Sequence, residues 1–278
     1  MRALRPTWFP SAAKFATLLA LTLGSAAAAA HHADAEQPDA ALYMAVPIVT
    51  GNDSRFRAGG VTQAFREVMV KLTGEPRLAA DLRIKKMSEQ AKNLVESFGY
   101  VDKMVAYFHH DDQGTFDRPH DLTVHFDPGK IDATLAELGE IRWENRPVIV
   151  PVIAVRGPTK SYLLNPEVPA GAAMRGSFVR DGIKFGVRVR IPRATELADW
   201  GVALDRPLPA VPSTETEARV HGNLEFKDAA PIGWSANWKM RWDGADYAWG
   251  VKGVSFDTAF DSLVGGVARV ASGHGAPD

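Results

Sequence analysis

Apolar residues recur every three or four positions along residues 61–74, which is the spacing of one face of an α-helix. The members of this stripe are Val61, Ala64, Phe65, Val68, Met69 and Leu72. Gly74 follows them, and glycine readily adopts the left-handed conformation in which many helices end. The pattern predicts a helix that packs on the core, with Ser54 as its capping residue and its end near Leu72.

The neighbouring segments alternate between strand and helix patterns. Residues 42–49 predict a strand with Leu42, Met44, Val46 and Ile48 on one face and with Pro47 at a sheet edge. The segment 75–99 predicts two further helical pieces, the second marked by Met87, Ala91, Leu94, Val95 and Phe98. We then expect strands at 100–108 and 121–126, a helix from Asp127-Pro128 to Gly139, and a strand covered on both faces at 147–155.

Regular patterns weaken in residues 156–217, where prolines are frequent. We predict an irregular, proline-rich connection, with a strand around residues 184–189 and a short helix at 193–200. The pattern becomes clear again with a strand of alternating Trp234, Ala236, Trp238, Met240 and Trp242. Asp243-Gly244 is a strong hairpin signal, and it places Trp238 opposite Trp249 and Arg241 opposite Asp246. Ser255 is expected to cap a final helix.

These elements predict an α+β protein. Its mixed strand and helix N-terminal unit spans residues 41–155, and the irregular connection spans 156–217. A small antiparallel meander packed on a C-terminal helix spans 218–272, and a disordered tail spans 273–278.

The first 30 residues have the three parts of a secretory signal peptide. Arg2, Arg5 and Lys14 are basic, residues 15–23 are apolar, and residues 25–30 are small. A transmembrane anchor is the alternative, but strong hydrophobicity ends at Leu23, short of a membrane span. We therefore predict export to the periplasm after cleavage, a flexible leader at 31–40, and no later membrane span.

Composition narrows the function classes further. Removal of residues 1–30 takes away three basic residues and no acidic one, so 32 basic residues become 29 against 33 acidic ones, a net charge of −4. This charge gives no support for nucleic-acid binding. The chain has no cysteine, which excludes disulfides and thiol catalysis. No nucleotide-binding or hydrolase motif is present, and we expect no cofactor.

Several markers stand in order along the chain. They include VMVKLTG at residues 68–74, WENRPVIVPV at 143–152, VHGNLEF at 220–226 and the tryptophan strand. In these motifs the sequence resembles the domain-of-unknown-function 2066 family of exported proteobacterial proteins, well over residues 42–155 and loosely over 218–270. The resemblance implies an exported location and an α+β fold, with no established activity and no known catalytic residues.

Two groups of side chains are candidate sites. The segment between the strands at 100–108 and 121–126 is rich in metal-ligand types, and the alternative is a solvated loop. Its candidate ligands are His109, His110, Asp111, Asp112, Asp117 and His120. Aromatic residues of the C-terminal hairpin offer a stacking platform for a glycan or apolar ligand, and the alternative is the core beneath the last helix. These residues are Trp234, Trp238, Trp242 and Trp249.

Two minor candidates complete the set. His31-His32, near the predicted mature N-terminus, could chelate copper or nickel. Glu144 and Arg146 flank a strand, where a structural ion pair or cap is the alternative to catalysis. The sequence favours a non-enzymatic envelope interaction or assembly protein whose partner is another envelope protein. A glycan or small-molecule binder and an unrecognised hydrolase stay as alternatives.

Overall fold

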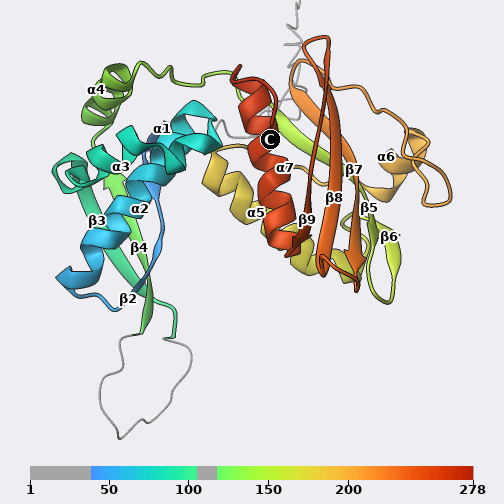
Figure 1. Cartoon of the computed structure of the whole chain (residues 1–278), viewed down its shortest axis with the longest axis horizontal. Coiled ribbons are helices and arrows are strands. Elements are labelled where there is room, and N and C mark those ends of the chain that lie inside the picture. Colours follow the sequence, from blue (N-terminus) through green and yellow to red (C-terminus); the bar gives the residue numbers. More distant parts are fainter. Residues whose placement is uncertain (1–38, 105–117, 278) are drawn as a thin grey trace, which may run out of the picture. The chain divides into compact units, whose positions relative to one another are not determined.

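The computed structural model describes residues 39–104 and 118–277, all within one compact unit that spans residues 37–278 (Figure 1). The α-helices are α1 (Asp39–Leu42), α2 (Ser54–Thr73), α3 (Leu82–Ser88), α4 (Pro128–Leu138), α5 (Ala172–Phe185), α6 (Ala194–Asp199) and α7 (Phe256–Ala271). Short 3-10 helices are η1 (Pro76–Ala80), η2 (Ala91–Leu94) and η3 (Pro169–Gly171). The strands are β1 (Met44–Ala45), β2 (Ile48–Thr50), β3 (Val95–Asp102), β4 (Pro119–Phe126), β5 (Val148–Arg156), β6 (Ser161–Leu163), β7 (Glu217–Lys227), β8 (Gly233–Trp242) and β9 (Ala245–Val254).

The first sheet is built around β4, which pairs with β1 and β2 along one edge and with β3 along the other, always antiparallel. Leu122, Val124 and Phe126 alternate along β4 and are buried, as the sequence pattern predicts. Helix α2 contacts β1, β2 and β4, and its residues Phe65 and Val68 are fully buried. The predicted packing helix is therefore confirmed as the cover of this sheet.

The ends of α2 and α4 follow local capping rules. Asp53, rather than the expected Ser54, caps α2, because its carboxylate accepts a hydrogen bond from the amide of Arg55 at 2.8 Å. Gly74 ends α2 in the left-handed conformation, with φ of 74°. Helix α4 begins at Asp127-Pro128 and ends at Gly139, as predicted.

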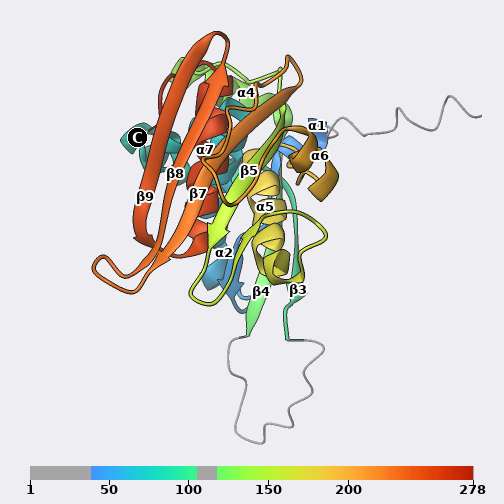
Figure 2. The ribbon, with the colours of Figure 1, turned by 90° about the vertical axis from the view of Figure 1, so that its right-hand side faces the viewer.

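The second sheet has the order β6-β5-β7-β8-β9, which Figure 2 shows with α5 and α7 against one face. Strands β5 and β7 are parallel, and the other neighbours are antiparallel. Helix α7 packs on β7, β8 and β9, and α5 packs on α7. On the opposite face, Val152 of β5 joins a small apolar cluster with Leu197 of α6, so β5 is covered on both sides, as predicted.

The tryptophan hairpin has the predicted register. Trp238 faces Trp249 and Arg241 faces Asp246. Asp243 and Gly244 have φ angles of 47° and 77°, the positive values that a two-residue hairpin turn of this type needs. Together with α7, capped by Ser255, this hairpin confirms the α+β class and the antiparallel meander on a C-terminal helix.

Two predictions for the N-terminal half were wrong. The strand at 42–49 is interrupted: Leu42 belongs to α1, and Pro47 separates β1 from β2. The helical segment at 75–99 ends early, because residues 95–99 form the first part of β3 rather than helix. The strand predicted at 100–108 accordingly starts at Val95, and its last residues lie outside the described part of the chain.

Three predictions for the C-terminal half also need correction. Residues 184–189 do not form a strand: Phe185 ends helix α5, and Val189 makes only an isolated bridge to Ile149. The segment expected to be irregular thus contains a 14-residue helix, α5. The tail after Gly273 folds back on α7, since Arg269 donates a hydrogen bond to the carbonyl of Ala276 at 2.9 Å.

Within residues 39–104 and 118–277, no helix has the length and apolar character needed to cross a membrane.

Candidate functional site: a groove between helix α2 and strand β3

A groove of about 670 Å³ lies between the first half of α2 and the start of β3. We call it the α2–β3 groove. Ala58 and Val61 of α2 line one wall, and Val95 and Phe98 of β3 line the other. Ser88 and Lys92, which precede β3, line it too. The other lining residues are polar or charged, among them Arg57, Glu89 and Glu96. The volume of the groove is in the range of ligand sites.

Two adjacent glycines of α2 have opposite surroundings. A Cβ atom at Gly60 would lie 2.6 Å from the side chains of both Leu122 and Val49, so this glycine lets α2 lie directly on the sheet. Gly59 has nothing within 4 Å of its ideal Cβ position, because it is turned about 100° around the helix and faces away from the sheet. Ala58 lines the groove, and its small side chain leaves the groove unfilled.

An arginine and an aromatic ring form the rim of the groove. The guanidinium carbon of Arg57 lies 4.5 Å from the centre of the Phe98 ring, within the range of a cation–π contact. Phe98 is 46% exposed although it is a large apolar residue. Thr62 donates a hydrogen bond to the carbonyl of Ser88 at 3.3 Å and ties α2 to the end of α3. An apolar ligand in the groove would cover Phe98 and lie against Arg57.

The hairpin tryptophans lie on the side of the second sheet that packs against α7. Trp238 is fully buried, with its ring centre 6.5 Å from that of Phe260. Trp249 is 7% exposed and donates its indole N–H to the carbonyl of Ser262 at 2.9 Å. Trp234 and Trp242 are half-buried. This is the arrangement of the core alternative, in which the two central indoles have no open face.

The proposed metal ligands are mostly beyond what the structure describes. His109, His110, Asp111, Asp112 and Asp117 lie outside the described residues, as do His31 and His32. His120 is described: its Nδ1 lies 2.8 Å from the carbonyl oxygen of Arg118. Residues 39–104 and 118–277 bring no three His, Asp or Glu side chains together in a geometry suited to a metal ion.

Glu144 and Arg146 do not meet. The guanidinium of Arg146 donates hydrogen bonds to the carbonyls of Leu72, Phe185 and Gly186, at 3.2 to 3.3 Å. It also stacks 4.6 Å from the ring centre of Trp143. Glu144 pairs instead with Arg142 at 3.3 Å and is largely exposed. Arg146 therefore acts as a cap for the ends of α2 and α5.

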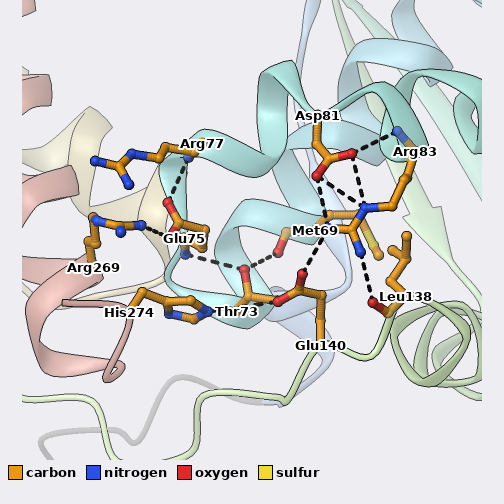
Figure 3. Close-up of polar contacts among 10 residues, drawn as sticks. All are labelled: Met69, Thr73, Glu75, Arg77, Asp81, Arg83, Leu138, Glu140, Arg269 and His274. Atoms are coloured by element: carbon orange, nitrogen blue, oxygen red, sulfur yellow. Dashed lines mark hydrogen bonds and ion pairs between the residues drawn. The ribbon is translucent and has the colours of Figure 1, made fainter. Parts of the chain in front are cut away.

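A polar cluster at the end of α7 was not predicted from the sequence (Figure 3). We call it the C-terminal clasp. Arg269 of α7 forms a buried ion pair with Glu75, which caps η1. The imidazole of His274 lies 2.8 Å from the hydroxyl of Ser272 and 3.8 Å from Glu140, and burial lowers the pKa of His274.

The clasp resembles a hydrolytic Ser-His-acid group only in composition. The 3.8 Å between His274 and Glu140 exceeds hydrogen-bond distance. The Ser272 hydroxyl also donates a hydrogen bond to the carbonyl of Arg269 at 3.2 Å, as a residue at a helix end often does. The contacts of the clasp hold the last turn of α7 against η1 and the segment after α4.

Two further ionisable side chains are buried. The ammonium of Lys71 donates hydrogen bonds to the carbonyls of Met44, at 2.6 Å, and Ala41, and burial lowers its pKa to about 8. Asp181 of α5 is 9% exposed, and one of its carboxylate oxygens has no hydrogen-bond partner among the described residues. Burial, and then the charge of Asp261, raise the pKa of Asp181 to about 7.

Sequence reasoning missed the α2–β3 groove. Residues 87–98 have apolar positions at helical spacing, and this pattern predicts Phe98 on the buried face of a helix. The available signal was the pair Val95 and Phe98 just before Gly99, where β-branched and aromatic residues favour a strand.

Comparison with known protein families gives a match for one part of the chain. Residues 37–144 match a domain of unknown function, DUF8605, and this match covers less than half of the 278 residues. The match overturns the resemblance to the domain-of-unknown-function 2066 family, which receives no support. No curated protein matches the sequence, and no solved structure matches it. The first sheet, α2 and the whole α2–β3 groove lie within residues 37–144, so the candidate site belongs to the part that is similar to DUF8605.

Proposed function

We propose that this protein is exported and serves as a non-enzymatic interaction protein of the bacterial envelope, with the α2–β3 groove as its binding site. The observation that carries the proposal is the groove itself, about 670 Å³ in volume, with an exposed Phe98 on its rim. Large apolar side chains exposed beside a concavity are typical of binding sites. Export is supported by the signal-peptide pattern of residues 1–30.

Site-directed photo-crosslinking in the native cells tests the binding site. Phe98, the aromatic residue on the rim of the groove, is replaced with a benzoylphenylalanine crosslinker, which leaves the groove open. Gly59, which has open space around it, receives the same crosslinker as the matched control. We expect a discrete crosslinked species from position 98 and none from position 59. Equal crosslinking at both positions, or none at either, would show that the groove is not the binding site.

Amino-terminal sequencing of the same protein tests export. The mature chain should begin between about residues 27 and 33. An intact Met1 in the membrane fraction would contradict cleavage, and the binding site would then need another location in the cell.

A further inference from the structure

Strand β3 is an unpaired edge in the part of the chain that the structure describes. Its one strand partner there is β4. Four consecutive residues, from Glu96 to Gly99, are exposed. A strand edge of this kind presents a row of backbone donors and acceptors to any extended segment that reaches it.

The hydrogen-bond pattern of β4 shows which groups of β3 point outward. The amide of Leu122 donates to the carbonyl of Pro47 at 2.9 Å. The even-numbered residues of β4 therefore direct their backbone N–H and C=O groups toward β1 and β2. The odd-numbered residues face β3, as the bond from the amide of Lys103 to the carbonyl of Pro119 confirms.

The register then separates two sets of residues in β3. Gly99 pairs with Thr123 and Val101 with Asp121, both odd-numbered, so the amides of Gly99 and Val101 point inward. Phe98 and Tyr100 alternate with them and direct their N–H and C=O groups away from β4.

The free edge and the α2–β3 groove share residues. Val95, Glu96, Ser97 and Phe98 belong to the strand and also line the groove. A segment that pairs with β3 would point every second side chain toward α2, because side chains alternate between the faces of a sheet. The backbone would thus be held by the edge of β3 while one side chain fills the groove, which is how strand addition gains specificity.

The positive charge of Arg57 at the rim of the groove favours a negative charge on the partner. Arg57 makes its cation–π contact with Phe98, and the described residues give it no acidic partner. The chain places a second arginine, Arg55, in the same turn, and Asp53 pairs with Arg55 rather than with Arg57. Glu89, Glu96 and Lys92 also line the groove, so an acidic side chain on the partner complements the groove only where it lies beside Arg57, next to the apolar anchor.

We infer that the partner is an extended peptide segment that adds to the free edge of β3 as a further strand, with an apolar side chain in the α2–β3 groove and an acidic one beside Arg57. This inference rests on the proposed function, since it names the chemistry of what the groove binds.

A displayed library of random peptides supplies the probe. Peptides are selected for binding to the mature chain. Those that also bind the Ala58→Phe variant, in which the groove is filled, are discarded. The Gly59→Phe variant is the matched control. Each selected peptide is then made in two N-methylated forms. One form carries the methyl groups on the odd-numbered residues and the other on the even-numbered residues, so each form blocks the backbone N–H groups along one edge of the peptide strand. We expect one set to weaken binding about tenfold or more, through lost backbone hydrogen bonds, and the other set to leave it unchanged.

Amide exchange of the protein gives a second readout. The amides of Phe98 and Tyr100 should exchange about tenfold or more slowly when the peptide is bound, because they gain hydrogen bonds. Those of Gly99 and Val101, already bonded to β4, should change little. Arg57→Glu should weaken the binding of acidic peptides and strengthen the binding of basic ones.

The outcomes separate the two proposals. Peptides that are lost on Ala58→Phe but tolerate both methylation sets would leave the groove as the binding site and overturn strand addition. If no peptide distinguishes the wild type from Ala58→Phe, the peptide partner is excluded. Crosslinking from position 98 then decides the proposed function separately.

Discussion

Strands β3 and β8 both carry aromatic residues, yet their surroundings are opposite. Trp238 of β8 is fully buried, whereas Phe98 of β3 is 46% exposed. Strand β8 has a partner on each side, β7 and β9, and lies under α7. Strand β3 has β4 alone in the described chain, and it leaves the groove open beside it. The comparison shows that an aromatic side chain is buried by its place in the sheet rather than by the pattern of its own strand.

Glycines allow close contact where the helices meet both sheets. A Cβ at Gly266 of α7 would lie 2.6 Å from the indole of Trp249, so α7 lies directly on the hairpin. In α2, Gly60 makes the same close fit to Leu122 and Val49. The difference between the two sheets therefore lies at β3, whose one strand partner among the described residues is β4.

The largest expected effect is the loss of the buried indole. Trp238→Ala should lower the free energy of unfolding by about 3–5 kcal/mol, the usual cost of truncating a large aromatic residue in a core. Phe98→Ala, the matched change in β3, should alter it by less than about 0.5 kcal/mol, because the ring is at the surface. Denaturant unfolding of both variants measures the difference. Similar losses in the two variants would remove the contrast between the strands.

Breaking the clasp should be nearly as costly. Arg269→Met leaves the carboxylate of Glu75 buried without its partner, which costs about 3–5 kcal/mol of stability. The side chains of this pair are 12% and 10% exposed. Arg241→Met is the control, because its pair with Asp246 is 63% and 75% exposed and should contribute less than about 1 kcal/mol. Equal thermal unfolding of the two variants would show that the clasp does not stabilise the fold.

A pH-dependent effect is expected at the interface of α5 and α7. The pKa of Asp181 is raised from 3.8 to about 7, so the folded chain holds a proton that the unfolded chain has released. The contribution of Asp181 to the free energy of unfolding should consequently fall as pH rises from about 4 to about 7, and then level off. Asp181→Asn removes this fall and should make the variant more stable than the wild type at pH 8, by on the order of a few kcal/mol.

The charged residues around Asp181 also affect its pKa. Arg180 pairs with Asp257 at 2.6 Å, and Lys184 pairs with Asp261. Lys184 and Arg180 oppose the shift in the pKa of Asp181, whereas Asp261 adds to it. Unfolding of the wild type and of Asp181→Asn is compared from pH 4 to pH 8. If the difference between the two chains does not grow with pH, Asp181 is ionised in the folded protein throughout this range.

The smallest effects concern two adjacent glycines of α2. Gly59→Ala should stabilise the protein by about 0.5–1 kcal/mol, since alanine favours helix and the site is open. Gly60→Ala should destabilise it by about 1–3 kcal/mol, because its Cβ would collide with Leu122 and Val49. Thermal unfolding distinguishes the signs. A stabilising Gly60→Ala would mean that α2 does not press on the sheet there.

Local signals in the sequence were sufficient for several elements. The Asp-Gly turn determined the hairpin register down to Arg241 opposite Asp246. Asp127-Pro128 and Gly139 marked both ends of α4. In these cases the residues that specify the element are neighbours in the sequence, so no knowledge of distant contacts was needed.

Other elements depend on distant contacts. In α5, Val179 and Ile183 are exposed while Asp181 is buried, so the apolar stripe of this helix is blurred. For β3, the deciding partner is β4, whose pairing cannot be derived from the spacing of residues 87–98. The groove needs α2, the end of α3 and β3 together, and the clasp joins residues almost 200 positions apart, Glu75 and Arg269. Neither follows from periodicity.

The charges along the open strand have a consequence for self-association. Glu96 and Asp102 stand three residues on either side of Gly99. If two copies paired through β3 about Gly99, each Glu96 would face an Asp102, which is unfavourable. Pairing about Phe98 would instead bring together the two Arg57 side chains that lie on the phenyl rings. Both of these registers place like charges near each other, so they disfavour pairing of β3 with its own copy and favour a strand of different sequence.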